Sequence, residues 1–129
     1  MFVDTSVIVA ILAKEADAQE FIDRIRSVDS CVTSALVVLE AAMRLSTLLV
    51  LDPRDARSAI LGILRELEVG IMPVGEAEAF ASIEAFALYG KGRHPARLNL
   101  ADCMSYASAK VHDLPLLYKG RDFAQTDLA

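Results

Sequence analysis

Several features of extracellular, membrane and zinc-binding proteins are scarce or missing in this sequence. Its 129 residues include two cysteines, Cys31 and Cys103, and no tryptophan. Two distant cysteines without a Cys/His cluster make neither a disulfide framework nor a zinc site, so we expect unpaired, buried thiols in a reducing compartment. No apolar run reaches the about 18 residues that span a bilayer. Residues 1–4 hold no basic residue and end in a carboxylate, unlike a secretory signal, so we expect a cytoplasmic protein.

Low-complexity segments, internal repeats and flexible linkers are missing as well. The chain has six glycines and four prolines, and 54% of its residues are hydrophobic, which excludes disordered and collagen-like classes. It has no GxxxxGK motif for nucleotide phosphates, and Gly90-Lys91-Gly92 follows no strand. A chain of this length is about one domain with one core. We therefore predict a single domain over residues 1–129.

Acidic residues outnumber basic ones, but unevenly along the chain. The formal net charge is −5. Residues 1–85 hold 7 Lys+Arg and 14 Asp+Glu, whereas residues 86–129 hold 6 Lys+Arg and 4 Asp+Glu. An acidic total argues against a protein that coats duplex nucleic acid through charge alone. It is compatible with a metal-dependent enzyme acting on nucleic acid, because a metal site needs carboxylates and the basic C-terminal third can hold phosphates.

Short apolar segments alternate with longer helical patterns, and this order predicts an α/β fold with a mainly parallel sheet. The expected strands are residues 1–3, 31–32, 69–74 and 114–118. The expected helices cover residues 16–28, 34 to about 50, 75–88 and 101–112, and a further helix starts at Asp52-Pro53 and carries Ala59 and Leu67 on its apolar face.

Two carboxylates in the first third of the chain are candidates for a functional site. Asp4-Thr5-Ser6 directly follows the first strand, and ligands of open α/β sheets bind outside the carboxyl ends of the strands. The alternative is that Asp4 is a helix N-cap. Glu40 lies among leucines, valines and alanines on a helix that we expect to be buried nearly all round. A lone buried carboxylate costs several kcal/mol unless a cation holds it, which favours a functional role over an exposed position.

Two further carboxylates lie in the C-terminal third. Asp102 is at the start of an apolar helix, where it could also be an N-cap, and Asp122 follows the last strand, where it could be a turn residue paired with Arg121. Asp127 is a weaker competitor nearby. Two carboxylates 4 Å apart repel by about 4 kcal/mol at an effective dielectric constant of 20, so they gather only around cations. Oxygen ligands without His or Cys suit Mg²⁺ or Mn²⁺, which favours metal-assisted phosphodiester hydrolysis.

The sequence resembles a known family in four segments that together span almost the whole chain. Residues 1–12, the helix around Glu40, residues 97–103 and residues 119–127 are similar in order and spacing to the motifs of the VapC toxins, PIN-domain ribonucleases of bacterial type II toxin–antitoxin pairs. The resemblance implies a PIN-like fold with a parallel sheet and helices on both faces. It also implies a Mg²⁺- or Mn²⁺-dependent endoribonuclease that cleaves structured RNA such as tRNA or rRNA, forms a homodimer and is inhibited by a cognate VapB-type antitoxin.

The resemblance also assigns residue roles. It makes Asp4, Glu40 and Asp102 an acidic triad, with Asp4 and Asp102 as the main metal ligands. Thr5 and Ser6 match small polar residues that hold a carboxylate or a water. Many relatives carry an acid or Asn at the position of Arg121, which leaves open whether Asp122, Asp127 or neither completes the site.

Two other functions and one set of cations complete the expectations. A phosphohydrolase with an aspartyl nucleophile after the first strand usually has a second acid two residues later, where this chain has Ser6. A catalytically silent PIN-like binding module would not need the acidic triad. The cations that could contact phosphate at the rim of the site, with a solvated loop as the alternative, are Lys91, Arg93, His94, Arg97, Lys119 and Arg121.

Overall fold

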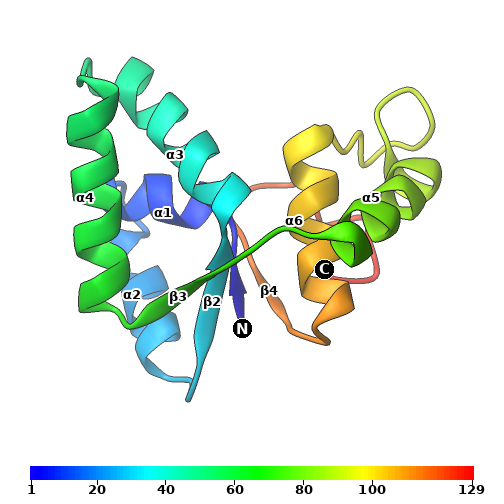
Figure 1. Cartoon of the computed structure of the whole chain (residues 1–129), viewed down its shortest axis with the longest axis horizontal. Coiled ribbons are helices and arrows are strands. Elements are labelled where there is room, and N and C mark those ends of the chain that lie inside the picture. The colour runs from blue at the N-terminus through cyan, green and yellow to red at the C-terminus, as the bar shows by residue number, and fades with distance from the viewer.

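The computed structural model describes residues 1–129 as a four-stranded sheet with six helices (Figure 1). In chain order the elements are β1 Phe2–Val3, α1 Thr5–Leu12, α2 Ala18–Arg26, β2 Cys31–Ser34, α3 Ala35–Leu48, α4 Pro53–Glu66, β3 Val69–Met72, α5 Glu76–Tyr89, α6 Leu100–Val111 and β4 Leu116–Leu117. All four expected strands and all expected helices are present, with ends that differ from the predictions by a few residues.

The sheet is parallel throughout, with the strand order β3-β2-β1-β4. Phe2 of the central strand β1 is in register with Val32 on one side and Leu116 on the other. Because all strands run in one direction, their carboxyl ends meet at one edge of the sheet. The segments that follow β1 and β4, which carry Asp4 and Asp122, therefore leave the sheet side by side.

Helices cover both faces of the sheet, as expected. Helices α1 to α4 gather on one side, where α1 packs against the other three, and α5 and α6 pack against each other on the opposite side (Figure 1). Helix α6 contacts β1, and it also contacts α3. One hydrophobic core joins these layers, and its fully buried side chains include Phe2, Ile8, Leu45, Ile60 and Phe123. This packing places the start of α6 next to the end of β1.

Helix starts are fixed by the capping side chains that the sequence indicated. The Arg54 backbone N–H donates to Asp52 Oδ1 over 2.8 Å, and Pro53 occupies the first turn of α4, where its missing N–H costs no hydrogen bond. Ser34 Oγ accepts from the Val37 N–H at the start of α3. Helix boundaries near the sheet are therefore set by local hydrogen bonds rather than by packing alone.

The expectation that α3 is buried nearly all round is wrong. Val37, Ala41 and Leu45 are buried and form one stripe with a spacing of four residues, whereas Leu39 and Met43 are 56% and 63% exposed. Ala59 of α4 is exposed as well, although the prediction placed it on the apolar face. An apolar side chain in the sequence does not say whether it faces the core or the surface, because a helix buries only the stripe that contacts its neighbours.

The two cysteines are free and buried, as predicted. Burial raises the pKa of both thiols, because the thiolate would lose its hydration. None of the six helices is long and apolar enough to cross a membrane.

The basic segment between α5 and α6 is a closed loop. The Lys91 N–H donates to Leu98 O and the Leu98 N–H donates to Tyr89 O, each over 3.0 Å, so the two ends of the loop lie together. Gly90 is required at this closure, since a Cβ there would lie 2.4 Å from the Phe86 carbonyl oxygen. These backbone hydrogen bonds hold the two ends of the loop in place, and the side chains of the loop project from there.

Candidate active site

Asp4 both caps a helix and presents a free carboxylate oxygen. It is 6% exposed at the end of β1 and is the N-cap of α1. Its Oδ2 accepts from the Ser6 backbone N–H over 3.0 Å and from Ser6 Oγ over 2.7 Å. No hydrogen bond goes to Oδ1. The capping role that the sequence left as the alternative is therefore real, but it uses only one of the two oxygens.

Thr5, beside Asp4, carries the one buried side-chain nitrogen or oxygen atom in the chain that has no hydrogen-bond partner. The residue is 1% exposed, and its Oγ1 meets no donor or acceptor. A buried hydroxyl left unsatisfied costs about 1–3 kcal/mol, so such atoms usually contact a bound water or ligand. The orphaned hydroxyl fits a site where an ion or its water shell lies against the start of α1.

Asp102 lies in the first turn of α6 and takes part in a reciprocal cap. The Asn99 N–H donates to Asp102 Oδ2 over 3.0 Å, and the Asp102 N–H donates to Asn99 Oδ1 over 2.9 Å. This capping box holds the Asp102 side chain at the helix start. As with Asp4, the capping interpretation is correct and leaves a second oxygen, Oδ1, without a partner.

Three of the predicted acids lie close enough to Asp102 for their charges to raise its pKa. The pKa of Asp102 is raised to about 6, first by burial and then by the negative charges of Asp122, Asp4 and Glu40, against the lowering effect of the Asn99 hydrogen bond. These carboxylates come from four separate segments of the chain. Repulsion between these carboxylates lowers the stability of the folded protein.

Glu40 and Asp122 are the less tightly held members of this acidic group. Glu40 is half-buried in α3, and Asp122 is exposed just beyond Gly120, whose φ of +96° forms the turn after β4. None of the six ion pairs in the chain includes either residue. The alternative in which Asp122 is paired with Arg121 is therefore not what the structure shows.

Asp127 does not belong to the acidic group. Its Oδ1 accepts from the Tyr106 hydroxyl over 2.6 Å and its Oδ2 accepts from Lys110 Nζ over 2.8 Å. The bond to Lys110, followed by that to Tyr106, lowers the pKa of Asp127, while burial and Asp127 raise the pKa of Tyr106. Asp127 thus fastens the C-terminal segment to α6.

The donor set suits a hard divalent cation, although the chain holds no ready-made cage. No three His, Cys, Asp or Glu side chains are close enough together to hold a metal ion on their own. Mg²⁺ keeps several waters and is usually bound through one or two carboxylates, so it does not require such a cage. The free Oδ1 atoms of Asp4 and Asp102, with the orphaned Thr5 hydroxyl, fit that mode of binding.

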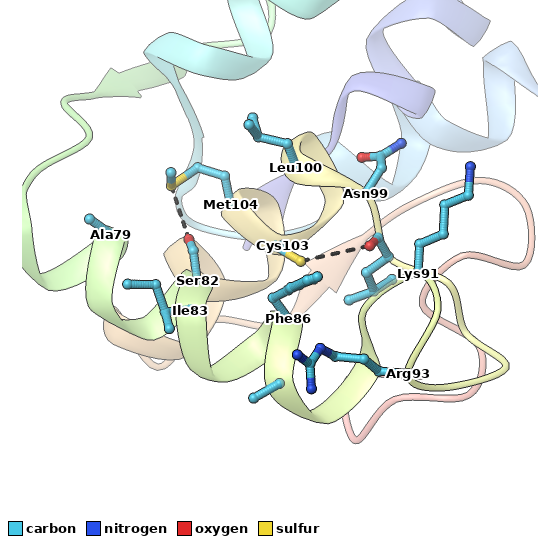
Figure 2. Close-up of a pocket in the computed structure, with 12 residues that line it drawn as sticks. Ala79, Ser82, Ile83, Phe86, Lys91, Arg93, Asn99, Leu100, Cys103 and Met104 are labelled. Carbon is cyan, nitrogen blue, oxygen red and sulfur yellow. Dashed lines mark hydrogen bonds between the residues drawn. The ribbon is translucent and has the colours of Figure 1, made fainter.

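Basic side chains and an apolar groove adjoin the start of α6. A groove of about 740 Å³ lies between α5 and α6, with apolar walls that include Phe86 and Met104 (Figure 2). Lys91 lies at its rim near Asn99, and Arg93 lies at the rim beside Phe86, with its guanidinium 5.2 Å from the centre of the Phe86 ring (Figure 2). Lys91, Arg93 and Arg97 are exposed, and none of them forms an ion pair.

Three other predicted cations have different surroundings. Lys119 is bound by Glu15 and Asp17, so it is not a free cation. His94 Nδ1 accepts from the Ala96 N–H within its own loop. Arg121 is exposed and unpaired.

Sequence reasoning found one of the partners that hold the acidic side chains: Ser6, expected to hold a carboxylate, donates to Asp4, whereas Asn99 was not identified as the partner of Asp102. The bond from Ser6 to Asp4 follows from local spacing, since a serine two residues after a cap lies within reach of it. The neutralisation of Lys119 by two acids more than 100 residues earlier in the chain has no local signal. Only the tertiary fold brings these residues together.

Comparisons with known proteins identify the family to which the chain belongs. The family model for the PIN domain matches residues 1–128. A VapC ribonuclease of Rhizobium meliloti is 39% identical, with 98% of each chain covered. Ribonuclease VapC28 of Mycobacterium tuberculosis is 41% identical, over 98% of this chain and 93% of the relative. The chain belongs to the VapC-type PIN-domain family.

Solved structures agree on the fold. The crystal structure of Mycobacterium tuberculosis VapC20, described as a sarcin-ricin loop cleaving toxin, has a TM-score of 0.70 and 21% identity and covers 95% of this chain and 92% of its own. A chain of a toxin–antitoxin complex from Klebsiella pneumoniae also has a TM-score of 0.70, with 17% identity over 98% of this chain and 92% of its own. At these identities the likeness establishes the architecture alone.

Proposed function

We propose that the protein is a Mg²⁺- or Mn²⁺-dependent endoribonuclease, the toxin of a type II toxin–antitoxin pair. The observation that carries this proposal is that Asp4, Glu40 and Asp122, from three other segments of the chain, lie close enough to Asp102 at the start of α6 for their charges to raise its pKa, a repulsion that a bound cation would relieve. The similarity to proteins named VapC ribonucleases supports the reaction class.

The residue roles follow from the geometry of each carboxylate. Asp4 and Asp102 would hold the cation through their free Oδ1 atoms, because their Oδ2 atoms are occupied by helix-capping bonds. A bound divalent cation supplies an activated water and neutralises charge on the scissile phosphate. Glu40 would complete the ligand shell of the cation or position the attacking water, and Asp122 would bind a second ion or an outer-shell water. Thr5 Oγ1 and Ser6 complete the polar wall, and in-line attack leaves 5′-phosphate and 3′-hydroxyl ends.

Structured RNA, such as tRNA or rRNA, is the substrate class that we propose. The relative VapC20 is described as cleaving the sarcin-ricin loop. Lys91 lines the groove together with Asn99, the residue that caps α6 at Asp102, and the exposed, unpaired cations of the 90–98 loop would hold the RNA phosphates that flank the scissile bond. These side chains are Lys91, Arg93 and Arg97.

Exposed apolar side chains support two protein partners, a second copy of the chain and a VapB-type antitoxin in the cytoplasm. Ile83 and Leu100, which line the groove between α5 and α6, are 63% and 75% exposed, Phe80 of α5 is 61% exposed, and α3 exposes the further apolar side chains Leu39, Met43 and Leu48. Apolar surfaces of this kind mark protein interaction sites. We propose that residues 1–129 act as a single PIN domain within that complex.

RNA cleavage by site variants tests the proposed function. We expect Asp4→Asn and Asp102→Asn to lose at least about 100-fold in cleavage rate, because each removes a charged ligand of the cation. Asp29→Asn, at the opposite end of β2, is the matched control and should cleave at the wild-type rate. Full activity in either site variant, cleavage undiminished by EDTA, or 2′,3′-cyclic phosphate ends would contradict the proposal.

A further inference from the structure

We propose that Lys119 is a positioning residue that orients Asp4 through Ser6. The inference rests on the proposed function, since it concerns how the cation ligand Asp4 is held. Lys119 lies two residues beyond β4 and is 37% exposed, and its Nζ binds Glu15 and also Asp17, the latter over 2.9 Å. Both acids belong to the segment between α1 and α2. The ion cluster therefore joins the chain after β4 to the segment between α1 and α2, which belongs to the helical layer formed by α1 to α4.

A short path of hydrogen bonds leads from Lys119 to Asp4. The Lys119 backbone N–H donates to Ser6 Oγ over 2.9 Å, and Ser6 Oγ is 2.7 Å from Asp4 Oδ2. A backbone N–H can only donate, so the serine oxygen must accept from it, and the single hydroxyl hydrogen is left to point at Asp4. The Lys119 backbone thus fixes the direction in which Ser6 donates.

This path decides which Asp4 oxygen is available. Asp4 Oδ2 receives two hydrogen bonds, one from the Ser6 N–H and one from its hydroxyl, so its rotation about the Cβ–Cγ bond is restricted. Oδ1 is the oxygen that remains for a cation. Partners of this outer kind set the orientation of a metal ligand and contribute strongly to metal affinity.

Tyr118 packs against the core and against the Phe123 ring, but few hydrogen bonds fix the backbone at residue 119, and there the Lys119 side chain contributes. The last sheet contact of this segment is the bond from the Asp4 N–H to Leu117 O, and Gly120 turns the chain away with a φ of +96°. Between Leu117 and Gly120, the polar contacts of residue 119 are the ion cluster and the hydrogen bond to Ser6. A cation shared by two half-buried acids is a small network, which holds its geometry better than one exposed pair.

Mn²⁺ affinity, measured by calorimetry on the metal-free full chain, separates positioning from simple charge. Lys119→Met removes a positive charge, so charge alone predicts tighter Mn²⁺ binding. The double variant Glu15→Gln/Asp17→Asn removes two negative charges, so charge alone predicts weaker binding. Positioning predicts weaker binding in both. Lys14→Met is the matched control, because Lys14 is exposed in the same segment without an ion pair.

We expect about three- to tenfold weaker Mn²⁺ binding for Lys119→Met and for Glu15→Gln/Asp17→Asn, and about tenfold weaker binding for Ser6→Ala. Lys119→Arg keeps the ion cluster and should bind within about twofold of the wild type. Adding Lys119→Met to Ser6→Ala should change the affinity no further, because both act on the same path. Lys14→Met should bind as tightly as the wild type or slightly more tightly.

Two results would overturn the role of Lys119. The first is Mn²⁺ binding by Lys119→Met that is as tight as in the wild type, or tighter. The second is a loss of Mn²⁺ affinity on Lys119→Met that is equally large in the wild-type and in the Ser6→Ala background. Circular dichroism in EDTA establishes that each variant is folded, and if Lys119→Met is not, Lys119→Arg and Glu15→Gln/Asp17→Asn decide the question. Asp4→Asn separates the two proposals. If Asp4→Asn binds Mn²⁺ like the wild type, the proposed metal site is wrong. If Asp4→Asn loses affinity but Lys119→Met and Glu15→Gln/Asp17→Asn do not, only the positioning role is wrong.

Discussion

At the scale of single residues, the ionised carboxylate of Asp102 lowers the stability of the folded protein. Burial and three neighbouring carboxylates raise its pKa to about 6, from the 3.8 of an ordinary aspartate. The ionised form is therefore less stable in the folded protein than in the unfolded chain. The resulting penalty is full above pH 6 and disappears as the pH falls towards 4.

We predict that Asp102→Asn stabilises the metal-free protein at pH 7 by about 1–2 kcal/mol, after allowance for partial exposure of the carboxylate. Asn can still accept the Asn99 N–H bond, so the helix cap is retained. Urea unfolding in EDTA at several pH values measures the effect, and the difference between variant and wild type should vanish near pH 4. A variant less stable than the wild type at pH 7 would contradict the raised pKa of Asp102.

The sequence predicted some of the site residues but not most of the contacts that these residues make. Asp4 and Asp102 could be found because each follows a strand or begins a helix in a pattern that has a local signal. Thr5 could be named but not its missing partner, since whether a buried hydroxyl is satisfied depends on the packed structure. The interactions of Lys119 and Asp127 join residues distant in sequence, so their roles as tethers were not predictable.

At the scale of elements, a buried carboxylate joins α5 to α6. Glu78 is 7% exposed in the first turn of α5. Its Oε2 accepts from the Gly75 N–H and its Oε1 lies 2.9 Å from Nε2 of His112, the C-cap of α6. The hydrogen bond with His112, followed by backbone bonds, lowers the pKa of Glu78 below its ordinary value of 4.5. Its ionised form thus stabilises the helix pair that lines the groove.

We predict that Glu78→Ala lowers the free energy of unfolding at pH 7 by about 1–2 kcal/mol, because it leaves a helix end and a histidine without their acceptor. Glu84→Ala, on the exposed face of the same helix, should have little effect. The stabilisation is present above pH 4.5 and is lost as the pH falls through the lowered pKa. Denaturation at pH 7 and pH 3 checks this, and an equal difference at both values would count against the ion pair.

The sequence predicted the four strands and five of the six helices, while α1 was anticipated only through the alternative in which Asp4 is a helix N-cap; the face that α3 buries was not predicted. The apolar stripe and the capping residue of α4 are local signals, and both predicted the helix that is observed. Helix α3 carries apolar residues on two sides, and only the stripe of Val37, Ala41 and Leu45 faces the core. The exposed leucines of α3 are equally apolar, so composition could not separate a core face from a face that is free in this chain.

At the scale of the whole molecule, an acidic protein presents a small basic loop beside an acidic site. The net charge of −5 repels RNA at long range, so binding depends on a few phosphate contacts close to the site. We propose that the loop between Lys91 and Leu98, whose two ends are joined by backbone hydrogen bonds, makes these contacts.

We predict that Arg93→Ala and Arg97→Ala each weaken RNA binding and each reduce the slope of log affinity against log salt concentration by about 1. Arg57→Ala, on the exposed face of α4, is the matched control and should leave the slope unchanged. Binding measured by fluorescence anisotropy at several salt concentrations, in a cleavage-deficient Asp102→Asn background, gives the slopes. Unchanged slopes for both loop variants would remove this loop from the RNA interface.

The central claim is that carboxylates distant in sequence share one divalent cation. A crystal of the protein grown with Mn²⁺, with anomalous diffraction data collected at the manganese edge, tests it most directly. The account predicts an anomalous peak bonded to Asp4 and Asp102, directly or through one water, with Glu40 and Asp122 facing the same peak. A peak elsewhere, or no peak at saturating Mn²⁺ with these side chains pointing apart, would contradict it.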